Sequence, residues 1–213
     1  MSDRNPPPPD PRAEPGPFGR LMVQIRQCKE DQTCPQLTSR CYYFEPNPVT
    51  AAEWRASGLY LADIDRRVVF VCESPGRQFS SVNDAAPSRC WAKTPQDERF
   101  RQARERYGFA NCYITNSVKC GVRTRGRHSD AEVTACRGFL AQELQLLAPL
   151  VTVGMGGNAY RTLRQEVLPL LDCPPVVFEI AHYSARGDVW SRWEREFAEL
   201  SRLLICLRPR VEW

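Results

Sequence analysis

The stretch RRVVFVCESPG, residues 66–76, decides the fold class of this chain. Residues 68–72 form a continuous apolar run rich in β-branched side chains, which is typical of a strand buried on both faces of a sheet. A Pro-Gly turn ends the run. Glu73 stands between the run and the turn, so a charged residue lies at the carboxyl end of the predicted strand.

Three further apolar runs alternate with segments of helical periodicity. The predicted strands are residues 109–120, 150–154 and 174–184. Residues 20–26 and 94–107 are predicted helices. A third helix begins at Ser129 or Asp130, with Glu132 in a capping box, and runs to Pro149. A C-terminal helix carries five apolar residues on one face: Trp190, Trp193, Phe197, Leu200 and Leu204. This alternation predicts an α/β fold, a three-layer α/β/α sandwich around a mainly parallel four-stranded central sheet.

The composition fits one soluble domain with a tail. At 213 residues and 42% hydrophobic residues, the chain is long enough for a full core. We divide it into a disordered proline-rich tail, residues 1–17, and one domain, residues 18–213. The net charge of +4 permits nucleic acid as a partner without indicating it. Because we find no secretory signal and no apolar run of membrane-spanning length, we expect a cytoplasmic protein with no membrane partner. We also expect a monomer.

The ten cysteines are many for a chain of this size. Because the thiols of a cytoplasmic protein stay reduced, this count indicates a metal or catalytic role before disulfides. Four of the cysteines lie in or beside apolar stretches, and we expect them to be small core residues: Cys72, Cys112, Cys173 and Cys206.

Polar residues follow several of the predicted strands. Glu73 follows the first, Asn116 lies near the end of the second, and His182 follows the fourth. In a parallel sheet the ligand crevice lies beyond the carboxyl ends of the strands, so these groups predict a site at one edge. The glycine turn at residues 154–157 follows the third strand. We interpret it as a packing feature, because a full dinucleotide-binding fingerprint is missing.

Four motifs together resemble those of the family-four, iron–sulfur uracil-DNA glycosylases. CESPG (72–76) resembles the family's Gly-Glu-x-Pro-Gly, and NCYITNSVKC (111–120) resembles its strand ending in Thr-Asn-x-x-Lys-Cys. AHYS (181–184) stands where the family has a His-Pro-Ser-type loop, and residues 136–163 resemble its helix, strand and glycine turn. The resemblance implies a monofunctional enzyme that hydrolyses the N-glycosidic bond of deoxyuridine in DNA and leaves an abasic site. DNA containing uracil or another deaminated base would be its partner.

The resemblance also implies a [4Fe–4S] cluster, held by Cys28, Cys34, Cys120 and Cys136. Fifteen residues, 121–135, separate Cys120 from Cys136, which is similar to the family's second ligand pair. The first pair is wider than the family's Cys-x-x-Cys, so Cys41 remains an alternative to Cys28. Zinc is the competing interpretation of four cysteines, but neither pair has the tight spacing of a zinc knuckle.

By the same resemblance, three residues perform recognition and catalysis. Asn116 would read the N3–H and O4 edge of uracil, because an amide both donates and accepts hydrogen bonds. His182 would donate a hydrogen bond to uracil O2, and Glu73 would orient water and steady the sugar cation. Each has a structural alternative: Asn116 as a tie between a strand end and a turn, His182 as a structural histidine, and Glu73 as an acceptor for its own turn. Ser74 and Gly76 would allow close backbone approach.

The remaining contacts are expected in loops. Trp91 in SRCW resembles the family's stacking aromatic, with Phe79 as a rival. The expected DNA contacts are Arg123, Arg125, Arg127, His128, Ser184 and the wedge candidate Arg186.

Two other functions stay open at this point. Tyr183 replaces the usual proline of the family's loop, which keeps a non-catalytic uracil-DNA-binding protein of the same fold possible. His128 follows a basic loop, as does the histidine with which a related subgroup of glycosylases captures deoxyribose covalently. Here the basic loop lacks that subgroup's extra length, so we favour a phosphate or helix-cap contact for His128.

Overall fold

The computed structural model describes residues 17–27, 65–74, 95–109, 112–119, 129–182 and 187–207. Four strands form the central sheet: β1 (Asp65–Cys72), β2 (Cys112–Asn116), β3 (Val151–Met155) and β4 (Val176–Ile180). The strand order is β2-β1-β3-β4, and each of the three pairings is parallel. The predicted α/β fold around a parallel four-stranded sheet is therefore confirmed.

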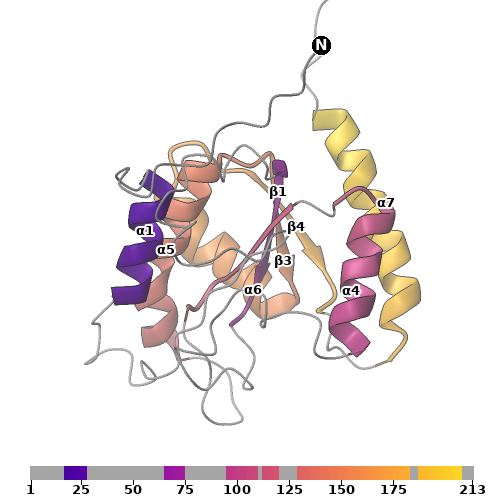
Figure 1. Ribbon diagram of the computed structural model, residues 1–213, viewed down its shortest axis with the longest axis horizontal. Coiled ribbons are helices and arrows are strands. Elements are labelled where there is room, and N and C mark those ends of the chain that lie inside the picture. Colours follow the sequence, from indigo (N-terminus) through magenta and orange to yellow (C-terminus); the bar gives the residue numbers. More distant parts are fainter. Residues whose placement is uncertain are drawn as a thin grey trace, which may run out of the picture.

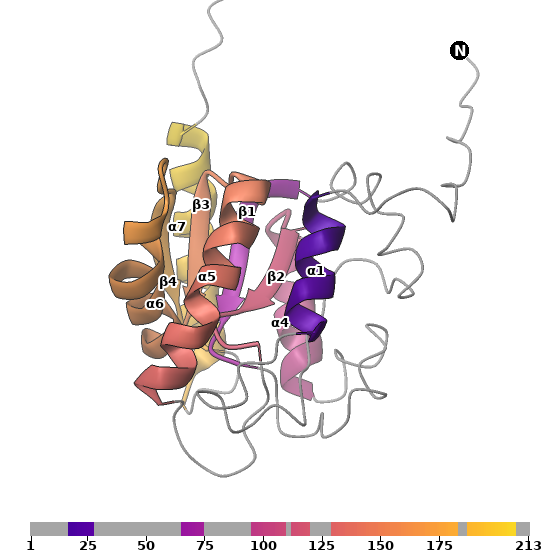
Figure 2. The same cartoon turned by 90° about the vertical axis from the view of Figure 1, so that its left-hand side faces the viewer.

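Helices cover both faces of this sheet and complete the three layers (Figure 1). One layer holds α1 (Pro17–Gln27), α5 (Asp130–Leu147) and α6 (Gly157–Thr162), which lie in front of the sheet in Figure 2. The other layer holds α4 (Pro95–Arg106) and α7 (Val189–Leu207). A π-helical turn, η4 (Leu163–Val167), and a 3-10 turn, η5 (Leu168–Leu170), connect α6 to β4.

Two hydrophobic cores fill the space between the layers, because successive side chains of a strand point to opposite faces of the sheet. Val68 and Phe70 of β1 pack with α4 and α7, where the Phe70 ring meets the Phe100 ring edge-on at 5.9 Å. Val69 and Val71 pack with α1 and α5. All five of the residues 68–72 are buried, as the apolar run in the sequence predicts.

The predicted capping box at the start of α5 is confirmed. The Ser129 hydroxyl accepts a hydrogen bond from the Glu132 N–H, and the Glu132 carboxylate accepts one from the Ser129 N–H at 2.7 Å. Ser129, and not Asp130, is therefore the cap residue. The predicted tail at residues 1–17 lies outside the described residues apart from Pro17, the first residue of α1.

The prediction that four of the cysteines are core residues is correct for only two of them. Cys72 and Cys112 are buried, but Cys173 and Cys206 are exposed, so the prediction of a core role is wrong for these two. Cys173 lies in the surface connection between η5 and β4, and Cys206 lies beside Ile205, which is 66% exposed on the outer side of α7. Trp190, which the sequence predicts to share one face of the C-terminal helix with four other apolar residues, is 38% exposed in the first turn of α7, whereas those four are buried.

Within the part of the chain that the structure describes, no helix combines the length and the apolar character needed to cross a bilayer.

The glycine turn after β3 is a packing feature, and this assignment can be tested. A Cβ at Gly154 would lie 2.6 Å from the Cα of Tyr160, because α6 packs directly on the end of β3. We expect Gly154→Ala to lower the free energy of unfolding by about 1–3 kcal/mol, measured by urea denaturation. Gly138→Ala is the matched control, since nothing lies within 4 Å of a Cβ there. In the middle of α5 it should stabilise the protein by about 0.5–1 kcal/mol. Equal effects of the two substitutions would contradict this account of the turn.

Candidate active site

The carboxyl ends of the four strands lie along one edge of the sheet. Cys72 and Asn116, the last residues of β1 and β2, are partners in the strand register. Glu73 therefore begins the segment after β1 beside the end of β2. His182 follows the end of β4, which lies beyond β3 in the strand order. The edge thus carries a carboxylate, an amide and an imidazole.

Glu73 is held through its backbone and its side chain. Its carbonyl accepts hydrogen bonds from the Ser117 hydroxyl at 2.8 Å and the Val118 N–H at 2.9 Å, which ties the end of β1 to the turn after β2. Its carboxylate accepts a hydrogen bond from the Asn158 side-chain amide at 3.2 Å. Glu73 and the adjacent Ser74 are only half-buried, so the carboxylate is oriented and still reachable.

Asn116 ends β2 and is 2% exposed. Its carbonyl accepts a hydrogen bond from the Lys119 ammonium at 2.7 Å. Its side-chain oxygen Oδ1 is buried and finds no hydrogen-bond partner among the described residues. A buried amide oxygen without a partner costs free energy, so such a group at a ligand edge calls for an explanation.

His182 is placed by neighbours in the turn after β3 and on α7. The preceding residue, Ala181, donates its N–H to the Glu196 carboxylate at 2.8 Å and accepts a hydrogen bond from the Trp193 indole at 2.8 Å. A Cβ at Gly156 would lie 3.1 Å from the His182 Cβ, and Gly156 has a φ of +87°. The glycine therefore allows the histidine to approach the end of β3 closely.

A cleft of about 190 Å³ opens beside Glu73. Glu73 and Ser117 line it from the sheet edge, Asn158 lines it from α6, and the first turns of α5 close it on the other side. Asn116 and His182 are not among its lining residues. Of the three predicted groups at the edge, only Glu73 therefore lines the cleft.

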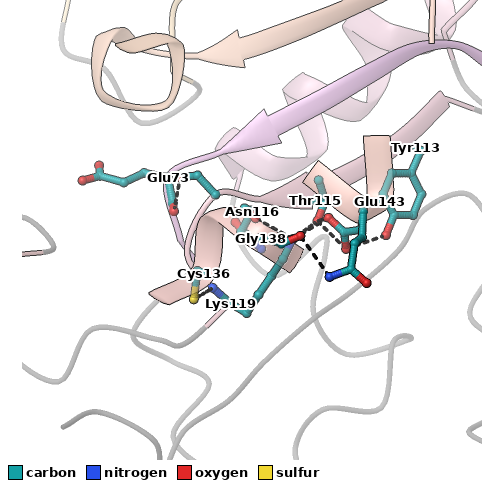
Figure 3. Close-up of polar contacts among 10 residues, drawn as sticks. Glu73, Tyr113, Thr115, Asn116, Lys119, Cys136, Gly138 and Glu143 are labelled. Carbon is teal, nitrogen blue, oxygen red and sulfur yellow. Dashed lines mark hydrogen bonds and ion pairs between the residues drawn. The ribbon is translucent and has the colours of Figure 1, made fainter. Parts of the chain in front are cut away.

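Sequence reasoning missed the charged network beneath this edge. Lys119 and Glu143 form an ion pair at 2.5 Å, with side chains that are 3% and 1% exposed. Thr115 and Tyr113 of β2 both donate hydroxyl hydrogen bonds to the Glu143 carboxylate (Figure 3). The sequence signal for this network was Glu143, a charged residue at an inward-facing position of the largely apolar helix α5.

Cys136 is the one proposed cluster ligand within the described residues. It lies on α5 and is 3% exposed. Its Sγ accepts a hydrogen bond from the Lys119 N–H at 3.4 Å. The residue that follows Lys119 in the chain is Cys120.

The other candidate residues lie outside the described residues. They are the cysteines Cys28, Cys34, Cys41 and Cys120, the base-contacting candidates Gly76, Phe79 and Trp91, and the DNA-contacting candidates Arg123, Arg125, Arg127, His128, Ser184 and Arg186.

Parallel α/β sheets bind their ligands at the edge where the carboxyl ends of the strands meet. The polar groups along that edge therefore indicate a ligand-binding site there. Residues 59–204, well over half of the chain, match the family model described as the Uracil DNA glycosylase superfamily. The chain belongs to this superfamily, and it is therefore of the DNA glycosylase class, with DNA as the substrate and a role in DNA repair. A comparison with curated proteins finds no match.

Proposed function

We propose that this protein is a monofunctional uracil-DNA glycosylase that hydrolyses the N-glycosidic bond of deoxyuridine in DNA and leaves an abasic site. One observation supports the proposal more strongly than the others. The Asn116 amide is buried at the ligand edge of the sheet, and its Oδ1 has no partner among the described residues. A base that enters the site can supply the missing donor.

Uracil offers a donor at N3–H beside an acceptor at O4. The Asn116 side chain presents the complementary pair, because its oxygen accepts and its nitrogen donates. Oδ1 would accept from N3–H, and Nδ2 would donate to O4. A base must leave the duplex before its edge can be read in this way, as in other enzymes that act on a flipped nucleotide.

Glu73 and His182 would act on either side of the bond that breaks. The C1′–N1 electron pair leaves with the base, and His182 donates a hydrogen bond to uracil O2, where negative charge develops. The Glu73 carboxylate orients a water molecule whose oxygen adds to C1′. The carboxylate then takes up the proton that this water releases. The Asn158 hydrogen bond to Glu73 keeps one carboxylate oxygen in place and supports this role.

The loops around the edge would bind the rest of the substrate. Ser74 and Gly76 allow the backbone to approach the base, and Trp91 stacks on its ring. Phosphate contacts would come from the basic segment 121–128, with Arg123, Arg125, Arg127 and His128, and Ser184 and Arg186 would fill the vacated stack.

The subtype that we propose carries a [4Fe–4S] cluster on Cys28, Cys34, Cys120 and Cys136. The surroundings of Cys136 fit such a ligand, because its buried sulfur accepts a backbone N–H, and hydrogen bonds to sulfur are typical of cluster ligands. Among the described residues, no three His, Cys, Asp or Glu side chains lie together as a metal group, and the other three proposed ligands lie outside those residues. The cluster would serve structurally, by fixing the segment between Cys120 and Cys136.

The cluster is tested by its iron. Anaerobically purified protein should be brown and contain roughly four irons per chain, because four thiolates hold one cubane cluster. Cys136→Ser should lower the iron content and bleach the colour. Cys206→Ser is the matched control, since Cys206 is exposed on α7, and it should leave both unchanged. Colourless protein that contains zinc would contradict the iron–sulfur assignment.

The activity is tested with a uracil-containing oligonucleotide that is incubated with the protein and then treated with alkali, which cleaves DNA at abasic sites. We expect strand cleavage at the uracil position. Tight binding of the oligonucleotide without cleavage would instead support a non-catalytic uracil-DNA-binding protein. A protein–DNA band that resists denaturant and is lost in His128→Ala would support covalent capture.

A further inference from the structure

The buried pair of Lys119 and Glu143 is completely hydrogen-bonded. An ammonium group has three donors, and the structure gives Lys119 three acceptors: Thr115 Oγ1 at 2.8 Å, the Asn116 carbonyl at 2.7 Å and Glu143 Oε2 at 2.5 Å. The Glu143 carboxylate also accepts from the Thr115 and Tyr113 hydroxyls. This leaves each charge fully compensated inside the protein.

A buried ion pair is weak evidence for stability, because removing two charges from water offsets much of their attraction. Apolar residues of similar size often replace such a pair without loss of stability. The pair instead fixes the positions of the groups that it contacts. Figure 3 shows the Lys119 side chain running back along its own turn toward β2, where it meets the Asn116 carbonyl and Thr115.

We propose that Lys119 and Glu143 are positioning residues that hold the Asn116 amide in the orientation required to read the base. The inference rests on the proposed function, since it assigns Asn116 the role of base reader. Lys119 holds the carbonyl of Asn116 itself, while Thr115, the preceding residue, is bound to both members of the ion pair.

The rest of the turn is fixed in the same way, which leaves Asn116 little freedom. Ser117 donates its N–H to the Cys72 carbonyl, and Val118 donates its N–H to the Glu73 carbonyl. Lys119 donates its own N–H to Cys136 Sγ. The backbone that follows Asn116 is therefore tied both to the end of β1 and to α5. The amide oxygen itself has no partner among the described residues to hold it directly.

This arrangement predicts a selective defect when the pair is removed. Substituting one member alone would leave an uncompensated buried charge, so the informative variant is the double substitution Lys119→Met with Glu143→Met. We expect its kcat/KM for uracil excision to fall ~100-fold, the effect of misplacing a reacting or recognising group by about 1 Å. Binding of free uracil should weaken, while binding of DNA with a tetrahydrofuran abasic analogue, which has no base to read, should stay as in wild type.

Thr115 supplies a second test with a smaller change. Thr115→Val keeps the shape of the side chain and removes the hydroxyl that links Lys119 to Glu143. Uracil binding should weaken about tenfold, the effect of one hydrogen bond to a charged group. Thr115→Ser restores the hydroxyl and should recover most of the affinity. Asp65→Asn, which removes an ion pair to Arg67 at the other end of β1, is the control for a general loss of charge pairing.

The outcomes separate the two claims. Wild-type protein that neither binds nor releases uracil would overturn the proposed function, and this inference with it. Active wild-type protein with a folded double variant that binds uracil equally well would overturn the inference alone. If the double variant does not fold, the Thr115 pair decides: equal uracil affinity of Thr115→Val and Thr115→Ser contradicts a positioning role.

Discussion

Asn116→Ala should lower kcat/KM for uracil excision by at least ~100-fold, because it removes the group that would pair with both polar atoms of the uracil edge. The same substitution should leave the free energy of unfolding unchanged or raise it. The Asn116 side-chain oxygen is buried without a partner among the described residues, so truncation breaks no hydrogen bond of that atom. Steady-state kinetics and urea denaturation measure the two effects on the same sample.

The substitution is informative because it should lower the activity without lowering the free energy of unfolding. A residue that merely tied the strand end to its turn would lose stability and activity together when truncated. Asn116→Asp is the matched variant, because it keeps the size of the side chain and replaces the donating nitrogen with an oxygen. It should be as inactive on uracil as Asn116→Ala. Full activity of either folded variant would contradict the role of Asn116 in reading the base.

Glu73→Gln should lower kcat by ~100- to 10,000-fold with little change in KM, the range expected for loss of a positioned acid–base group. The substitution isolates the charge, because a glutamine oxygen can still accept the hydrogen bond from Asn158. The Glu73 carbonyl keeps its hydrogen bonds to Ser117 and Val118 in any variant. Single-turnover measurements of base release on saturating uracil-DNA report the chemical step.

Asn158→Ala is the companion to this variant. It removes the orienting hydrogen bond and keeps the charge, so its effect on kcat should be smaller than that of Glu73→Gln. If Glu73→Gln retained wild-type kcat, Glu73 would be a structural acceptor for Asn158 and not a catalytic group.

The fold was predictable because its signals are local. The apolar run at residues 68–72 and the capping box at Ser129 depend on neighbouring residues, and both appear in the structure as expected. The placement of Glu73, Asn116 and His182 at one edge follows from the parallel sheet, since such strands end together.

The buried network could not be read from the sequence in the same way. Lys119 and Glu143 are 24 positions apart and meet only because α5 packs over the end of β2. Cys206 illustrates the converse, because its apolar neighbours in the chain suggested burial, whereas helix periodicity places it on the exposed side of α7. The contact between Lys119 and Glu143, by contrast, depends on how α5 packs against β2, which sequence periodicity does not specify.

Release of the free base from DNA, followed by mass spectrometry on matched oligonucleotides that contain uracil or cytosine at one position, tests the assignment most directly. Cytosine has no N3–H to donate to Asn116 Oδ1. We predict release of uracil by the wild-type protein, no release of cytosine, and loss of uracil release in Asn116→Ala. Release of neither base, or release of cytosine as fast as uracil, would contradict the assignment of this protein as a uracil-DNA glycosylase.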